Sequence, residues 1–166
     1  MGWDTHREPW SQSVKNRLIA LAAGVPIVVL AAIGVQAQDV MSVTVSTATH
    51  GELGTYLVDR QGRSLYLFLA DEPGVTQSNC FDICAETWPA LTTNGDPVAE
   101  SAVNADFLGA FMRTEATRQA TYNGWPLYYH TEDERPGDIN GHDVEQFGAA
   151  WHLVTPEGEA AGGEDE

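Results

Sequence analysis

The sequence predicts a mainly β protein, in which a single N-terminal transmembrane helix precedes one antiparallel β domain built from two related hairpin repeats. Three observations support this fold class. An apolar run without charged residues covers residues 18–35, runs of strand length recur through residues 39–156, and the later hairpin pattern repeats the earlier one at an offset of 62 residues. Together they predict one anchored domain made of two copies.

The apolar run LIALAAGVPIVVLAAIGV has the length of a membrane span. In helical geometry it extends about 27 Å, close to the thickness of the hydrocarbon core. Pro26 lies inside it, and proline is better tolerated in membrane helices than in soluble ones. Lys15 and Arg17 precede the run and a strongly acidic stretch follows it, so the positive-inside rule places an arm of residues 1–17 in the cytoplasm. We therefore expect the following domain on the periplasmic side of the inner membrane.

Residues 18–35 also fit a second interpretation, a signal peptide cleaved at a small-residue site near Ala37. The arm favours retention as a signal anchor, because it is long for a signal peptide and carries Trp3 and Trp10. Tryptophan side chains suit the headgroup region of a bilayer. The sequence therefore predicts a single-pass membrane protein, with cleavage near Ala37 as the alternative.

The charge of the chain is strongly negative. It has 24 acidic and 8 basic residues, with a formal net charge of −16. Such a field repels nucleic acid and attracts cationic proteins or metal ions, although acidity also simply keeps an exported domain soluble. The tail of residues 157–166 is acidic and poor in apolar residues, so we expect it to be disordered. The only basic residues after the apolar run are Arg60, Arg63, Arg113, Arg118 and Arg135.

Strand patterns follow one another at short intervals through the domain. Asn123-Gly124 readily supplies the positive φ angles of a tight hairpin turn. Helical patterns are confined to residues 80–87 and 104–112. The predicted strands cover residues 40–47, 54–59, 64–69, 121–122, 125–130 and 149–154, and the first hairpin turn covers residues 60–63.

The hairpins recur in two copies, residues 52–91 and 113–156. The segment YLFLAD at residues 66–71 aligns with YYHTED at residues 128–133, and Trp88 aligns with Trp151. Because a two-stranded hairpin cannot bury a face alone, we expect the two copies to share one core. The predicted motif and core residues are Tyr66, Phe68, Asp71, Trp88, Trp125, Tyr128, Asp133 and Trp151.

These segments resemble the family of secreted repeats of unknown function, also described as predicted lipoproteins with a Y-x-[FWY]-x-x-D motif. The resemblance rests on GTYLVDRQGRSLYLFLAD, SNCFDICAETWPAL, ATYNGWPLYYHTED, RPGDINGHD and WHLVTPEG, in that order. It implies an exported, surface-anchored domain without an established reaction. The chain departs from the family pattern in three ways. It lacks the lipobox cysteine, which makes the transmembrane helix the substitute anchor, and it has Asp82 where the cysteine loop usually has glycine and His130 at the aromatic motif position.

Cys80 and Cys84 are the only cysteines. In a helical turn this spacing places the Cα atoms about 6 Å apart, within disulfide range, and an oxidising exterior favours the bond. The disulfide would fix the turn that leads to Trp88. The alternatives are a redox-active pair, which the acidic neighbours Asp82 and Glu86 disfavour, and half of a metal site.

His130, His142 and His152 lie in the second copy together with several aspartates. If the strands bring them together, they could bind a divalent transition metal such as zinc or copper. Spaced histidines on separate strands more often pack or face solvent. Residues 138–143 have the first half of a calcium loop but lack its distal glutamate, so a solvated turn is the better interpretation.

The sequence contains none of the short motifs of hydrolases, metalloproteases or phosphate-binding loops, so we expect a non-catalytic protein without a cofactor. The favoured hypothesis is an accessory subunit that docks onto a larger integral membrane complex, with electron-transfer and photosynthetic light-harvesting assemblies as candidate hosts. Its acidic domain could steer a cationic soluble protein such as a cytochrome. The alternatives are a metal-binding or redox surface protein that uses the three histidines, and a free cell-surface scaffold protein.

Overall fold

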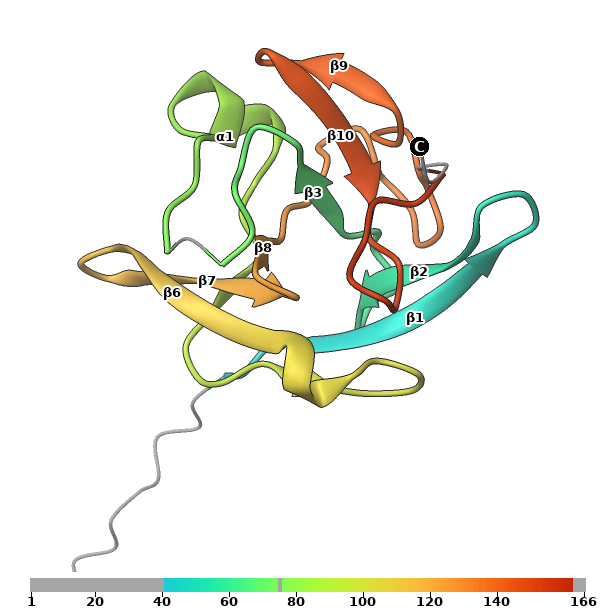
Figure 1. Ribbon diagram of the computed structural model, residues 1–166, viewed down its shortest axis with the longest axis horizontal. Coiled ribbons are helices and arrows are strands. Elements are labelled where there is room, and N and C mark those ends of the chain that lie inside the picture. Colours follow the sequence, from blue (N-terminus) through green and yellow to red (C-terminus); the bar gives the residue numbers. More distant parts are fainter. Residues whose placement is uncertain (1–40, 75, 163–166) are drawn as a thin grey trace, which may run out of the picture. The chain divides into compact units, whose positions relative to one another are not determined.

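The computed structural model describes residues 41–74 and 76–162 (Figure 1). Within these residues no helix is both long and apolar enough to span a membrane. The predicted arm, the apolar run and the anchor residues Trp3, Trp10, Lys15, Arg17 and Pro26 lie outside the described residues.

Strands dominate the described residues. The single α-helix among them is short, and a 3-10 helix, η1, precedes the sixth strand. The elements in chain order are β1 (Thr44–His50), β2 (Gly54–Asp59), β3 (Tyr66–Phe68), α1 (Ile83–Thr87), β4 (Thr92–Thr93), β5 (Val98–Ala99), η1 (Ala105–Phe107), β6 (Leu108–Thr114), β7 (Thr117–Tyr122), β8 (Trp125–Pro126), β9 (Val144–Gln146) and β10 (Ala149–Leu153).

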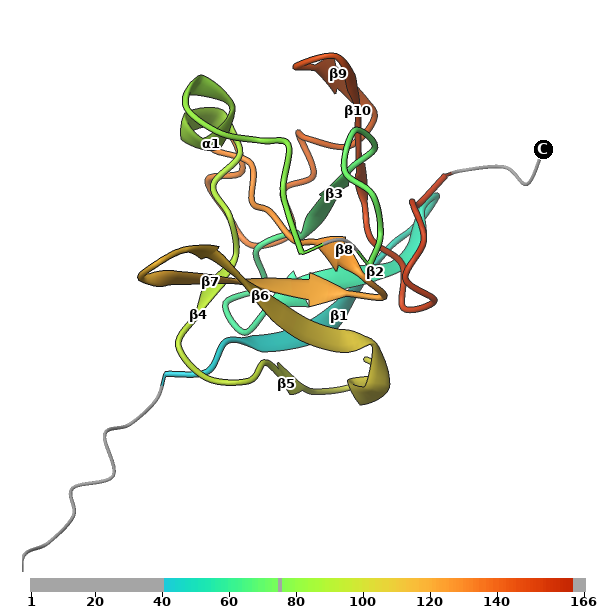
Figure 2. The same ribbon diagram turned by 60° about the vertical axis from the view of Figure 1, so that its left-hand side comes forward.

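The strands form three small sheets. The first has β1 between β2 and β5, the second has β10 between β3 and β9, and the third has β7 between β4 and β6, with β8 also paired to β7. The pairing of β1 with β5 is parallel, whereas the other strand pairs are antiparallel. The domain is therefore mainly β as predicted, and its strands form several small sheets in which one strand pair is parallel. Figures 1 and 2 show α1 and the β9–β10 turn at one end of the domain and the start of the described chain, Met41, at the other.

The hairpin predicted at Asn123-Gly124 is confirmed. Tyr122 pairs with Trp125, and both turn residues have positive φ. The turn at residues 60–63 is also present, since the Asp59 N–H donates to the Arg63 carbonyl at 2.9 Å. After this turn Ser64 still bridges Val58, and the Leu65 N–H donates to the Leu57 carbonyl at 3.0 Å. The chain then continues into β3, which pairs with β10. Local turn residues thus set the connection, while the distant strand sets the pairing.

The helix predicted over residues 104–112 is wrong. Only Ala105–Phe107 are helical, and β6 follows directly. It pairs with β7 from Leu108 opposite Tyr122 to Thr114 opposite Thr117. Because a continuous strand partner lies beside it, tertiary pairing overrides the weak local helical pattern. The other predicted helix, residues 80–87, is shortened to α1.

The two repeats pair with each other at their motif tyrosines. The Tyr66 N–H donates to the Tyr128 carbonyl at 2.9 Å, and the Tyr128 N–H donates to the Tyr66 carbonyl at 3.0 Å. The flanking bonds are duplicated in the same way, so the repeats are related by an approximate two-fold axis. The equivalent bonds, each 2.8 Å long, run from the Leu57 N–H to the Val154 carbonyl and from the Ala120 N–H to the Leu91 carbonyl.

Two clusters of buried side chains fill the domain. The first holds the motif aromatics, both cysteines and the two aligned tryptophans. The second contains five leucines among its ten buried residues and includes Tyr122. Trp125 departs from the prediction, because it is half-buried and packs against the second cluster. Its pairing with Tyr122 at the β7–β8 turn directs it there. The predicted shared core therefore exists without Trp125.

Candidate functional site

The two copies of the motif exchange their side-chain hydrogen bonds. The Tyr66 hydroxyl donates to Asp133 Oδ2, and the Tyr128 hydroxyl donates to Asp71 Oδ2, both at 2.6 Å. Each tyrosine therefore binds the carboxylate of the other repeat rather than the one in its own motif. Both tyrosines are fully buried. The tyrosine and the aspartate have the same spacing in both motifs, and their hydrogen bonds join one motif to the other.

The second oxygen of each motif carboxylate binds backbone. The Asn79 N–H donates to Asp71 Oδ1 at 2.6 Å, and the Asn140 N–H donates to Asp133 Oδ1 at 2.8 Å. Each asparagine amide then donates to the carbonyl of the residue before the aspartate. Sequence analysis missed these two asparagines. Their signal was a nearly equal spacing after each motif, Asn79 following Asp71 and Asn140 following Asp133.

Burial controls the titration of these groups. It raises the pKa of Tyr66 and Tyr128 well above the ordinary value, and the neighbouring carboxylates raise each further. Both tyrosines are therefore neutral hydrogen-bond donors. Burial also raises the pKa of Asp71 and Asp133, partly offset by the bonds each carboxylate accepts from its tyrosine and its asparagine. The polar groups of the motif thus satisfy each other across the repeat boundary.

Four rings lie in series, three of them in the first cluster, and we call them the aromatic column. Phe68 stacks on Trp151 with centroids 4.1 Å apart, Trp151 stacks on Trp88 at 4.0 Å, and Trp88 lies against His130 at 4.2 Å. The third motif position of each repeat therefore covers the tryptophan of the other repeat. This arrangement explains why an aromatic residue is favoured at that position, since a flat ring completes the stack.

His130 occupies the aromatic position of the second motif and lies against Trp88. It is 6% exposed, and its Nδ1 has no hydrogen-bond partner among the described residues. Burial lowers its pKa, an effect that Asp133 and Glu132 partly oppose, so the imidazole lies against Trp88 as a neutral ring. Gly141 packs closely against this part of the column. A Cβ added at Gly141 would come within 2.7 Å of the Trp88 ring.

The other two histidines of the predicted metal set lie together. His142 and His152 have ring centroids 5.6 Å apart, and His142 Nδ1 accepts the Leu153 N–H at 3.3 Å. Burial and the neighbouring His152 lower the pKa of His142. No group of three or more His, Cys, Asp or Glu side chains in residues 41–74 and 76–162 is arranged to hold a metal ion. The structure therefore joins two of the three predicted ligands and assigns His130 to the column.

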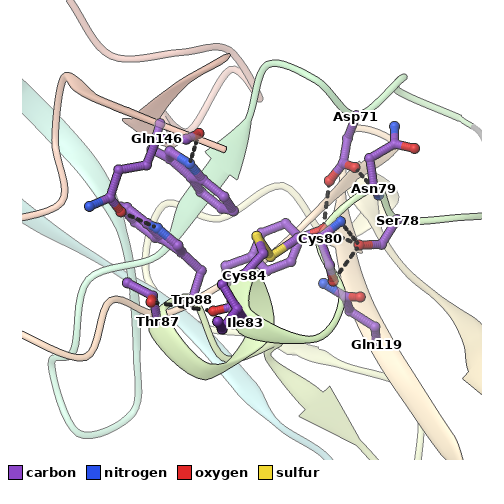
Figure 3. Close-up of a disulfide and its surroundings, with 12 residues drawn as sticks. Asp71, Ser78, Asn79, Cys80, Ile83, Cys84, Thr87, Trp88, Gln119 and Gln146 are labelled. Carbon is purple, nitrogen blue, oxygen red and sulfur yellow. Dashed lines mark hydrogen bonds between the residues drawn. A yellow bond between two sulfur atoms is a disulfide. The ribbon is translucent and has the colours of Figure 1, made fainter. Parts of the chain in front are cut away.

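The predicted disulfide is present between Cys80 and Cys84, with Cα atoms 5.2 Å apart (Figure 3). The Cys84 carbonyl accepts the Trp88 N–H at 2.7 Å, so the bridged turn positions that indole directly. Trp88 Nε1 in turn donates to Gln146 Oε1 at 2.9 Å, which ties α1 to β9 (Figure 3). The bridge thus closes the turn that leads to Trp88.

Comparison with known proteins identifies the two copies. The family model described as "Secreted repeat of unknown function" matches residues 47–92 and 109–155. No curated protein and no solved structure matches the chain. The matched segments contain both tyrosine motifs and both aligned tryptophans, which are the residues that join the repeats. The chain therefore belongs to the family of secreted repeats of unknown function, and it carries two copies of the repeat.

Proposed function

We propose that this chain is a non-catalytic accessory subunit, anchored in the inner membrane by residues 18–35, whose periplasmic domain docks onto a larger membrane complex. One observation carries the proposal. The motif tyrosines and carboxylates, which lie inside the domain, bind each other across the repeats. What the domain offers a partner is therefore its surface.

The surface best suited to docking is the end that carries α1 and the β9–β10 turn. We call it the distal patch, because α1 and the β9–β10 turn lie away from the start of the described chain in both ribbon views (Figures 1 and 2). It exposes Ile83 by 66%, with Phe81 and Phe147 each close to half exposed. The patch consists of Phe81, Asp82, Ile83, Glu86, Glu145 and Phe147, and all six are exposed.

The chemistry of the distal patch indicates the kind of partner. Its apolar side chains alternate with carboxylates, so a complementary surface would present apolar and basic side chains. An electron-transfer or light-harvesting complex is the host class that we propose. The acidic domain on its outer face would also raise the encounter rate of a cationic soluble carrier. Both roles depend on the negative charge of the chain, which has 24 acidic and 8 basic residues.

Two matched variants test this proposal. Ile83→Glu places a charge in the distal patch, whereas Met112→Glu places the same charge on β6, where the methionine is 56% exposed. The native membrane is solubilised in mild detergent, and the mass and composition of the complex are measured for each variant. We expect one defined membrane complex with the parent chain and with Met112→Glu, and its loss with Ile83→Glu. Isolation of the parent chain as a lone monomer would refute the proposal and favour a free scaffold protein.

A second candidate function is metal binding, favoured by the proximity of His142 and His152. Titration of the full chain with zinc or copper, read by calorimetry, would test it. Saturable binding lost in His152→Phe but kept in His130→Phe would support a site at this pair. Less than about a tenth of an equivalent of bound metal, measured by elemental analysis, would refute metal binding.

A further inference from the structure

A second feature of the surface is a cavity of about 480 Å³ near the start of the described chain. Met41 lies at its edge, the β2–β3 turn supplies Arg60 and Arg63, and Leu91 and Tyr129 supply apolar wall. Its volume is in the range of small-molecule sites. It therefore has room for an organic ligand larger than a single ion.

The charge of this cavity is opposite to that of the chain. None of its lining residues is acidic, although the chain has 24 acidic residues and only 8 basic ones. Two of the lining residues are arginines. A cavity without carboxylates in so acidic a chain keeps a local positive potential, because close charges outweigh distant ones that solvent ions screen.

Arg63 is held in place by partners behind the cavity wall. Its Nε and Nη2 each lie 2.8 Å from Oδ2 of Asp59, which is 2% exposed. Its guanidinium carbon also lies 3.9 Å from the centre of the Tyr129 ring, and the Tyr129 hydroxyl donates to the same carboxylate at 2.9 Å. This network fixes one arginine with its charge balanced by Asp59.

Arg60 provides the net positive charge. Its side chain is exposed, and no described residue gives it an ion pair or a hydrogen bond. A guanidinium offers several N–H donors in a planar fork that matches the oxygens of a phosphate group. An unpaired guanidinium beside a fixed one, above an apolar wall, is the arrangement expected for an anion attached to an organic body.

We propose that this cavity binds a phosphate group carried by an organic ligand, with Arg60 as its main charged contact. Two sources share this chemistry, a phospholipid headgroup and a soluble phosphate compound. The headgroup source rests on the membrane anchor proposed above, because only residues 36–40 separate Met41 from the predicted end of the apolar run. Binding at the cavity itself does not require that anchor or the distal patch.

The test uses the full chain in a non-ionic detergent and follows binding by titration calorimetry. The probes are dihexanoyl phosphatidylglycerol, dihexanoyl phosphatidylcholine and inorganic phosphate. Arg60→Gln removes the charge from the cavity. The matched control Arg118→Gln removes the same charge from β7, where Arg118 pairs with exposed Asp96 at 3.1 Å and does not line the cavity.

We expect saturable binding of at least one anionic probe, and an affinity loss of roughly tenfold or more in Arg60→Gln but not in Arg118→Gln. Preference for phosphatidylglycerol over inorganic phosphate assigns the headgroup source, and the reverse order assigns a soluble phosphate. Where phosphatidylglycerol binds, equal affinity for phosphatidylcholine assigns the contact to the phosphodiester that both lipids share. The proposal is overturned by equal affinities in the two variants or by the absence of saturable binding. Loss of the membrane complex in Ile83→Glu is an independent result, so this test and that of the docking proposal can fail separately.

Discussion

Removal of the Tyr128 hydroxyl tests the exchange of bonds between the repeats. This hydroxyl donates to Asp71 Oδ2 at 2.6 Å and lies 2.7 Å from Ser78 Oγ. Tyr128 is fully buried and Asp71 is 3% exposed, so water cannot easily replace the lost donor. A hydrogen bond to a buried charged group contributes about 1.5–3 kcal/mol, so we expect Tyr128→Phe to lower the free energy of unfolding by about 2–3 kcal/mol.

The equivalent change in the first repeat should cost less. Tyr66 donates to Asp133, which is half-buried, so water can partly solvate that carboxylate when the hydroxyl is removed. We expect Tyr66→Phe to cost about 1–2 kcal/mol. Urea unfolding of the full chain in non-ionic detergent, followed by tryptophan fluorescence, measures both values, because Trp88 and Trp151 in the aromatic column report the loss of packing.

A double-mutant cycle shows whether the bond itself is responsible. Asp71→Ala removes the acceptor, and the double variant with Tyr128→Phe should be less destabilised than the sum of the single variants by about 2 kcal/mol. The same cycle between Tyr66 and Asp71, which belong to one motif but share no hydrogen bond, should show coupling near zero. Coupling within the motif that equals the coupling across repeats would refute the exchange.

Three further predictions concern single positions and pH, each measured by urea unfolding. Gly141→Ala should cost about 2 kcal/mol, because its Cβ would come within 2.7 Å of an indole in the column, whereas Gly51→Ala meets no atom within 4 Å and should be near neutral. Asp82→Gly should raise the free energy of unfolding by about 1 kcal/mol, because Asp82 has φ 51° and ψ −122° and its side chain makes no capping hydrogen bond. A lower free energy of unfolding would contradict this prediction. Burial raises the folded pKa of Asp71 and Asp133 above 3.8, so the folded state binds their protons more readily. As the pH falls from about 7 to 4, the free energy of unfolding of the parent should rise relative to that of a variant with asparagine at both positions. The same pH dependence in the parent and in the variant would contradict this prediction.

Local signals in the sequence were sufficient for several elements. Asn123-Gly124 predicts the β7–β8 turn because few other dipeptides adopt its positive φ angles, and the structure has it. The cysteine spacing predicts the disulfide, since two cysteines one helical turn apart already lie within bonding range. The repeat itself follows from the alignment of YLFLAD with YYHTED. Each of these signals lies within a few consecutive residues.

The partner of each strand and side chain could not be predicted in the same way. Residues 108–114 form β6 only because β7 lies beside them, and nothing within the segment names that partner. The tyrosine motif has the same spacing whether Tyr66 binds Asp71 or Asp133, so the sequence alone cannot show that the bond crosses the repeats. The arginine cavity could not be predicted from the sequence either, because its walls come from four separate segments.

The approximate two-fold axis allows the contacts that occur in both repeats to be distinguished from the features that occur in only one. The bonds and stacks that occur twice, from the tyrosine–carboxylate pairs to the aromatic column, satisfy each repeat only through the other, so they belong to stability. The features that occur in only one repeat are therefore the candidates for binding a partner or a ligand. The disulfide helix, which builds part of the distal patch, is present only in the first repeat. The β2–β3 turn is also distinct, since Asn123-Gly124 replaces Arg60-Gln61-Gly62 at the equivalent turn and brings no arginine. Because both proposed binding surfaces arise from these departures, exchanging the β2–β3 turn for Asn-Gly should abolish phosphate binding while leaving the tyrosine–carboxylate bonds intact.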